Sequence, residues 1–195
     1  MKPNTDQLDI EMVLAGNVNA FANIIARYKD FVYTVVIRMV KNKEEAEEIS
    51  QDTFIKAFQS LSNFKGESKF STWLYTIAYR KALDSIKKSK RTISSETIDL
   101  VNEGNLGLIQ NGLDYLEAKE RREIIQNCVQ QLPEGMAAAI TFYYFEDLST
   151  KEIATIMELS QDNVKIKLYR GRKKLFTLLE QYIKPETIYN NGQAI

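Results

Sequence analysis

Apolar residues recur at helical spacing along most of the chain. Between Phe70 and Ala78 they fall at offsets of 0, 3, 4, 7 and 8, and between Phe21 and Met39 they keep a spacing of three or four. This is the period of one face of an amphipathic α-helix. The pattern therefore predicts an all-α protein.

Capping and helix-stopping residues mark where the first helices begin and end. A short helix is expected over residues 6–15, with Gly16 stopping it. Asn19 is a suitable N-cap for a longer second helix, which should end near Lys41.

A third helix is expected to open with a capping box formed by Asn42 and Glu45 and to run to about Leu61. Its apolar residues cover one wide arc. The opposite face is acidic, with five acidic and no basic residues between Glu44 and Asp52. Taken alone, this is a solvated face; the alternative is a surface for a protein partner.

Residues 64–91 combine a polar loop that contains Gly66, an aromatic helix and a basic end. The apolar stripe of the helix, with Trp73 on it, should be buried. Tyr75 and Tyr79 lie off the stripe, and six basic residues against one acidic residue lie between Arg80 and Arg91. Aromatic rings can stack on unpaired bases, and cations neutralise phosphates. The face therefore suits nucleic acid, although a merely solvated basic face fits the stretch equally well.

Residues 93–115 lose helical periodicity and predict a flexible linker. A stretch of about 25 residues reaches on the order of 80 Å when extended. The chain is therefore expected to form two small helical domains that can grip well-separated sites. Residues 185–195 are polar and aperiodic, which predicts a frayed tail.

The second domain should contain a helix-turn-helix. One helix is expected to end at Leu132, before Pro133, and another to run over residues 134–145. Ser149 and Glu152 form a capping box for a third helix, and Ser160 caps a fourth after a turn of about three residues.

The helix after Ser160 exposes polar and basic residues that can reach base edges and phosphates in a major groove. Six basic residues and one acidic residue lie between Ser160 and Lys174. Glu158 occupies the turn, and a positive φ there would cost about 1 to 2 kcal/mol. The alternative is an ordinary amphipathic helix pair with a basic surface.

Composition limits the chemistry. The 195 residues include 26 basic and 26 acidic ones, one cysteine and no histidine. Cys128 has helical spacing with Ile125 and Val129, so it is expected in the core, and no disulfide can form within the chain. The missing histidine removes the usual general base and the commonest metal ligand. We expect no catalysis, no cofactor and no metal, and the polar N-terminus and single cysteine predict a cytoplasmic protein.

The stretch FKGESKFSTWLYTIAYRKALDSIKKSKR resembles region 2 of bacterial RNA polymerase sigma factors, in the extracytoplasmic-function (ECF) group of the sigma-70 family. Residues 147–175, DLSTKEIATIMELSQDNVKIKLYRGRKKL, resemble sigma region 4. The resemblance implies region 2 over residues 1–92, the linker over 93–115, region 4 over 116–184 and the tail over 185–195. Glu158, Asn163 and Ile166 depart from the family's usual residues.

The same resemblance implies three binding surfaces. Residues that stand where the family docks on core polymerase are Glu48, Gln51, Asp52, Phe54, Ile55 and Phe58. Residues implied for the single-stranded minus-10 promoter element are Lys65, Gly66, Glu67, Ser68, Lys69, Tyr75, Tyr79, Arg80, Asp84, Lys87 and Lys88. Residues implied for the minus-35 duplex are Ser160, Gln161, Asn163, Lys165, Lys167, Tyr169, Arg170, Arg172 and Lys173.

These surfaces predict a sigma factor with core RNA polymerase, promoter DNA and an anti-sigma factor as partners, and with no small-molecule substrate. The alternative is a stand-alone helix-turn-helix regulator whose N-terminal helices bind an effector or dimerise. The aromatic and basic helix over residues 70–91 favours the sigma factor, because a reader of duplex DNA needs no single-strand surface.

Overall fold

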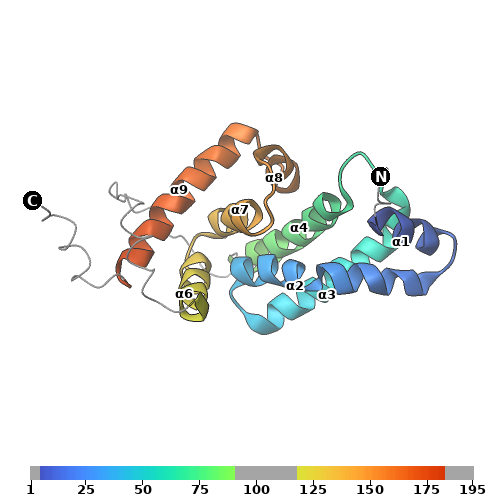
Figure 1. Cartoon of the computed structure of the whole chain (residues 1–195), viewed down its shortest axis with the longest axis horizontal. Coiled ribbons are helices and arrows are strands. Elements are labelled where there is room, and N and C mark those ends of the chain that lie inside the picture. The colour runs from blue at the N-terminus through green and yellow to red at the C-terminus, as the bar shows by residue number, and fades with distance from the viewer. Residues whose placement is uncertain (1–4, 91–117, 183–195) are drawn as a thin grey trace, which may run out of the picture.

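The computed structural model describes residues 5–90 and 118–182, and every regular element in these two segments is a helix (Figure 1). This confirms the all-α prediction. The predicted linker and tail lie outside the described residues.

Four α-helices form the first half of the chain, together with short 3-10 helices at Val18–Ala20 and Leu61–Asn63: α1 (Thr5–Leu14), α2 (Phe21–Val40), α3 (Lys43–Gln59) and α4 (Phe70–Lys90). Gly16 follows α1 with a φ of 101°, as predicted from its freedom to adopt positive φ. The prediction for Asn19 is wrong. Asn19 lies inside the 3-10 helix that leads directly into α2, and no side chain caps α2.

Half of the predicted capping box forms at the start of α3. The Asn42 side chain accepts a hydrogen bond from the Glu45 backbone N–H at 2.8 Å. The Glu45 carboxylate instead accepts one from the Ser85 hydroxyl of α4. Glu45 therefore ties α3 to α4 rather than closing its own helix.

The second half contains α6 (Ala118–Gln130), α7 (Glu134–Phe145), α8 (Thr150–Met157) and α9 (Gln161–Glu180). Pro133 precedes α7, as predicted. Ser149 and Glu152 form the complete capping box of α8, and the Ser160 hydroxyl accepts the Asn163 N–H at 3.2 Å to cap α9. The turn residue Glu158 has a φ of 55°, so it carries the backbone strain that its position implied.

The two halves share one apolar core. In Figure 1, α7 and α8 lie against α2 and α4, while α9 runs along the far side of the second half. Phe142 of α7 packs on Phe31 of α2 and on Tyr75 of α4, with ring centroids 6.3 Å and 6.0 Å apart. Cys128 is buried in a smaller cluster with Phe176 and Leu179 of α9, which confirms its prediction as a core residue. The sequence did not predict that the halves pack together.

Candidate nucleic-acid interface

One exposed face of α3 brings together most of the residues predicted to dock on polymerase. Helical spacing places them in one row, because residues three and four apart are neighbours on a helix. The exposed members are Glu48, Gln51, Asp52, Ile55 and Phe58. Phe54 is buried instead and supports the face from beneath. The row therefore combines two carboxylates with two exposed apolar side chains.

Contacts with neighbouring helices hold this face in place. The Asp52 carboxylate lies 2.9 Å from the Lys81 ammonium of α4. Phe58 packs edge-on against Phe21 of α2, with a centroid distance of 5.2 Å. The Phe58 ring is nevertheless 38% exposed and Ile55 is 54% exposed, so both can still contact a partner.

The loop before α4 presents all five of its predicted minus-10 residues to solvent: Lys65, Gly66, Glu67, Ser68 and Lys69. Gly66 adopts a φ of 73°, which favours glycine. Phe64 and Phe70 flank the loop and meet edge-on at 5.5 Å, and both pack on the half-buried Trp73. This aromatic cluster fixes the base of an otherwise exposed loop.

Tyr75 and Tyr79 are buried, contrary to the exposed aromatic face that the sequence predicted. They are 1% and 7% exposed. The Tyr75 ring packs on Tyr28 and Phe31 of α2 as well as on the second half of the chain. Tyr75 stacks on Phe142, and its hydroxyl donates a hydrogen bond to Glu146 at 3.0 Å. Burial raises the pKa of Tyr79, and nearby Glu134 and Glu158 raise that pKa further.

The polar end of α4 is exposed. Arg80, Asp84, Lys87 and Lys88 all face solvent, as predicted. Arg80 forms an ion pair with Glu158, in the turn between α8 and α9. Lys69, at the other end of the candidate surface, pairs with Glu152 at 2.8 Å. Sequence patterns missed both pairs, because each joins residues that are far apart in the chain.

The helix-turn-helix presents one side of α9 to solvent. Buried Ile153, Met157, Val164 and Leu168 join α8 to α9. Six of the predicted minus-35 residues are exposed: Ser160, Gln161, Asn163, Lys165, Tyr169 and Arg170. The exposed residues thus provide hydrogen-bonding groups, the aromatic ring of Tyr169 and the cationic side chains of Lys165 and Arg170.

The remaining three predicted minus-35 residues are half-buried. The Lys167 ammonium lies over Gly135 at the start of α7, where an added Cβ would meet it at 3.2 Å. Arg172 donates a hydrogen bond to the Tyr144 hydroxyl at 3.4 Å, and Lys173 is partly covered. The sequence did not single out Tyr144, because α7 is apolar nearly all round and its pattern hides which side is exposed.

The two halves match two related families. Residues 24–92 match the family described as Sigma-70 region 2, and residues 122–175 match the family described as Sigma-70, region 4. The chain is 34% identical over 175 residues to the ECF RNA polymerase sigma factor SigW of Bacillus subtilis, covering 85% of this chain and 92% of the relative. It is 30% identical over 187 residues to the RNA polymerase sigma-H factor of Pseudomonas aeruginosa, covering 92% and 96%. The chain belongs to the ECF RNA polymerase sigma factors.

Solved structures share the fold of this ECF sigma factor. CnrH, solved in complex with the cytosolic domain of CnrY, matches with a TM-score of 0.64 at 20% identity, covering 91% of this chain and 99% of that one. The sigma factor RpoE of Bartonella quintana, co-crystallised with the anti-sigma factor NepR, matches with a TM-score of 0.63 at 20% identity, covering 82% and 96%.

The region 2 match decides between the two functions that the sequence left open. A stand-alone regulator would account for the helix-turn-helix but not for a first half that matches Sigma-70 region 2. ECF sigma factors are transcription initiation factors. Within residues 5–90 and 118–182, none of this factor's helices is both long enough and apolar enough to cross a membrane.

Proposed function

We propose that this chain directs core RNA polymerase to promoters, with region 2 over residues 1–92 and region 4 over residues 116–184. The observation that carries the proposal is that three exposed surfaces differ in charge and polarity. An acidic and apolar row lies on α3, and basic surfaces lie on α4 and α9. One surface then meets a protein and the other two meet polyanions.

Core polymerase docks on the exposed row of α3 in this proposal. Ile55 and Phe58 supply apolar contacts, and Glu48 and Asp52 pair with cationic side chains of the polymerase. Exposed apolar side chains beside charged ones are a common composition for a protein-binding site. Phe54, buried beneath the row, acts by holding the helix rather than by contact.

The minus-35 duplex lies along α9. Arg170 and Lys165 are long exposed cations of this helix that can reach base edges or phosphates of a major groove. Gln161 and Asn163 lie in the first turn of the helix, the part that enters the groove in helix-turn-helix proteins.

The melted minus-10 strand meets the loop Lys65–Lys69 and the basic end of α4. A surface that binds unpaired bases stabilises only the open state of the promoter, so its binding energy favours melting. Tyr75 and Tyr79 are buried, so they can contact DNA only if the packing around them changes.

The chain itself catalyses no reaction in this proposal, and the polymerase supplies the chemistry. It acts in the cytoplasm, where bacterial RNA polymerase works, and needs no cofactor or metal. An anti-sigma factor is a further expected partner. The RpoE structure, which shares the fold, holds such an inhibitor.

Binding of fluorescently labelled chain to purified core polymerase tests the docking surface. Asp52→Ala should weaken this binding several-fold and leave contacts with DNA unchanged. Glu47→Ala is the matched control, because Glu47 is an exposed carboxylate of the same helix outside the docking row. Equal polymerase affinities for the two variants would remove Asp52 from the docking site.

A further inference from the structure

One apolar side chain stands in the middle of the exposed face of α9. Ile166 is 47% exposed. It lies two positions after the buried Val164 and two positions before the buried Leu168. Two positions correspond to about 200° around an α-helix, so Ile166 points away from the core that both neighbours enter. Its side chain therefore projects toward solvent, opposite the packed face of the helix.

The residues that surround Ile166 on the helix surface are polar or aromatic. Residues three and four positions away are neighbours on a helix. All four of these positions are exposed, and they hold Asp162, Asn163, Tyr169 and Arg170. The Asp162 carboxylate carries a counter-charge, because Lys165 Nζ lies 3.0 Å from it. Ile166 thus sits at the centre of a face whose other side chains can bind phosphates or form hydrogen bonds with bases.

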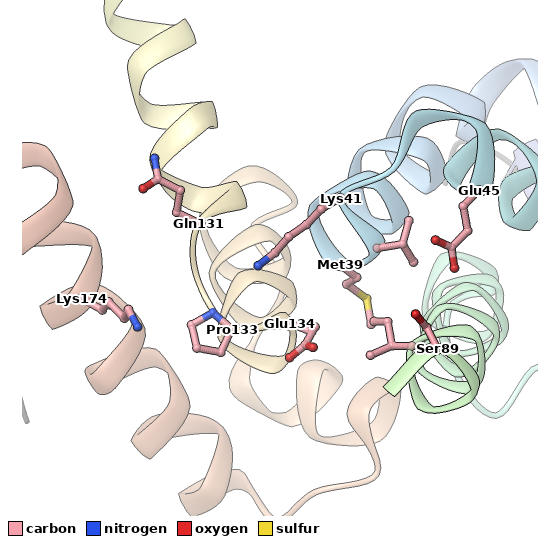
Figure 2. A pocket seen from close by; sticks show the side chains of 10 residues that line it. Met39, Lys41, Glu45, Ser89, Gln131, Pro133, Glu134 and Lys174 are labelled. Carbon is pink, nitrogen blue, oxygen red and sulfur yellow. The ribbon is translucent and has the colours of Figure 1, made fainter. Parts of the chain in front are cut away.

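The second half of α9 serves the fold instead. Phe176 and Leu179 are buried with Cys128 of α6. Figure 2 shows Lys174 projecting from α9 toward Pro133, on the wall of a pocket of about 380 Å³ between the two halves of the chain. The stretch of α9 that can lie against DNA is therefore its first half, residues 161–170, which includes Ile166.

The proposed function places this stretch in the major groove of the minus-35 duplex, where side chains at the middle of the exposed face meet base edges. Isoleucine neither donates nor accepts a hydrogen bond, whereas nearly every group on those edges is a donor or an acceptor. The exception is the C5-methyl group of thymine. An isoleucine held against a G·C pair would leave polar base groups without water and without a partner, which costs affinity.

We infer that Ile166 reads a thymine of the minus-35 element by packing against its C5-methyl group, with the exposed Tyr169 ring beside it. This inference rests on the proposed function. The neighbouring cations Lys165 and Arg170 anchor the helix on the duplex, and Ile166 then selects the base pair. A T·A or A·T pair is preferred at this position, and a G·C pair is rejected.

Salt concentration separates this contact from the contacts of the cations. Binding of phosphates by lysine and arginine releases counterions, so it weakens as salt rises. Contact between two apolar groups removes them from water and releases no counterion. Burial of one methyl group corresponds to about a fourfold change in affinity. The effect of the thymine methyl group should therefore be about fourfold at both low and high salt.

The test uses the chain bound to core polymerase and the promoter fragments that this complex selects. Each thymine of the minus-35 element, on either strand, is replaced in turn by deoxyuridine, which lacks only the C5-methyl group. Competition binding then gives the relative affinities. We expect one position at which the replacement weakens binding of the wild type about fourfold, equally at low and high salt.

Ile166→Ser removes the contact from the protein side. The position is exposed and outside the caps and the core, so α9 should fold normally. The variant should bind the thymine and deoxyuridine duplexes equally. Ile25→Ala is the control, because Ile25 is an exposed isoleucine of α2, and it should keep the fourfold difference. The two-by-two comparison separates the methyl contact from any general weakening of binding.

Two results would overturn the inference while supporting the proposed function. One is a minus-35 element in which no thymine responds to the replacement, and the other is a fourfold response that persists in Ile166→Ser. Weaker binding of Ile166→Ser to polymerase, with the fourfold response unchanged, would show that this side chain meets protein rather than DNA. Failure of the polymerase-bound wild type to select any promoter fragment would instead overturn the proposed function.

Discussion

Glu152 Oε1 lies 2.8 Å from Lys69 Nζ, and the other oxygen of the same carboxylate accepts hydrogen bonds from the hydroxyl and the N–H of Ser149. One carboxylate thus closes the first turn of α8 and joins the helix-turn-helix to the loop before α4. Local folding of region 4 and its contact with region 2 are therefore coupled through Glu152.

The first prediction concerns pH. Lys69 and Ser149 lower the pKa of Glu152 from its ordinary value of 4.5 to about 2. A lowered folded-state pKa stabilises the fold above the unfolded-state pKa, and this contribution is lost as pH falls toward the folded-state pKa. The wild type should therefore be more stable than Glu152→Gln near pH 7, and the difference should shrink between about pH 5 and pH 2. Urea unfolding at a series of pH values measures it.

Glu123→Gln is the control for that series, because it removes an exposed carboxylate of α6. Its stability should follow the wild type at every pH. A difference between wild type and Glu152→Gln that stays constant down to about pH 2 would contradict the assigned ion pair.

The second prediction concerns backbone strain at Glu158. Its φ of 55° costs an ordinary residue about 1 kcal/mol or more, whereas glycine adopts this conformation freely. Glu158→Gly should raise the free energy of unfolding by about 1 kcal/mol. Glu158→Gln keeps the strain and should change it by less than about 0.5 kcal/mol, because the ion pair with Arg80 is exposed. Equal stabilities of the two variants in thermal unfolding would rule out the strain.

The third prediction concerns duplex binding. Arg170→Ala should weaken binding of the polymerase-bound chain to minus-35 duplex about tenfold or more, as loss of one base contact does. Arg122→Ala removes an exposed arginine of α6 that is not among the predicted minus-35 residues, and should have little effect. Fluorescence anisotropy at fixed salt measures both variants. An equal loss of duplex affinity in the two variants would mean that the net charge of the chain, rather than the exposed residues of α9, governs binding.

The fourth prediction concerns the core of the helix-turn-helix. Ile153 is fully buried between α8 and α9, so Ile153→Ala should reduce the free energy of unfolding by about 2 to 5 kcal/mol. Thr155→Ala, at an exposed position of the same helix, should cost less than about 1 kcal/mol. Denaturant unfolding of both variants tests the predicted packing.

Local features of the fold could be predicted because neighbouring residues determine them. Pro133 ends one helix and precedes the next, and Ser149 and Ser160 cap α8 and α9 with hydrogen bonds to residues three positions later. Asn19 shows the limit of such signals. A good capping residue does not act as a cap when a 3-10 turn runs directly into the helix.

The burial of Tyr75 and Tyr79 could not be predicted in this way. Periodicity placed both tyrosines off the apolar stripe of α4, but it carries no information about which residues cover them. Tyr75 meets Glu146, which lies 71 residues further along the chain. Contacts of this kind depend on how distant segments of the chain pack against each other, and no residue nearby in the sequence indicates them.

Transcription in a purified system tests the central claim most directly. The chain is mixed with core RNA polymerase and fragments of the genome from which it comes, and RNA 5′ ends are mapped. We predict that the mixture initiates at discrete sites, while the chain alone and the polymerase alone do not. The contrary result is a chain that binds duplex fragments tightly by itself and leaves initiation by the polymerase unchanged, and it would contradict the assignment as a promoter-directing subunit.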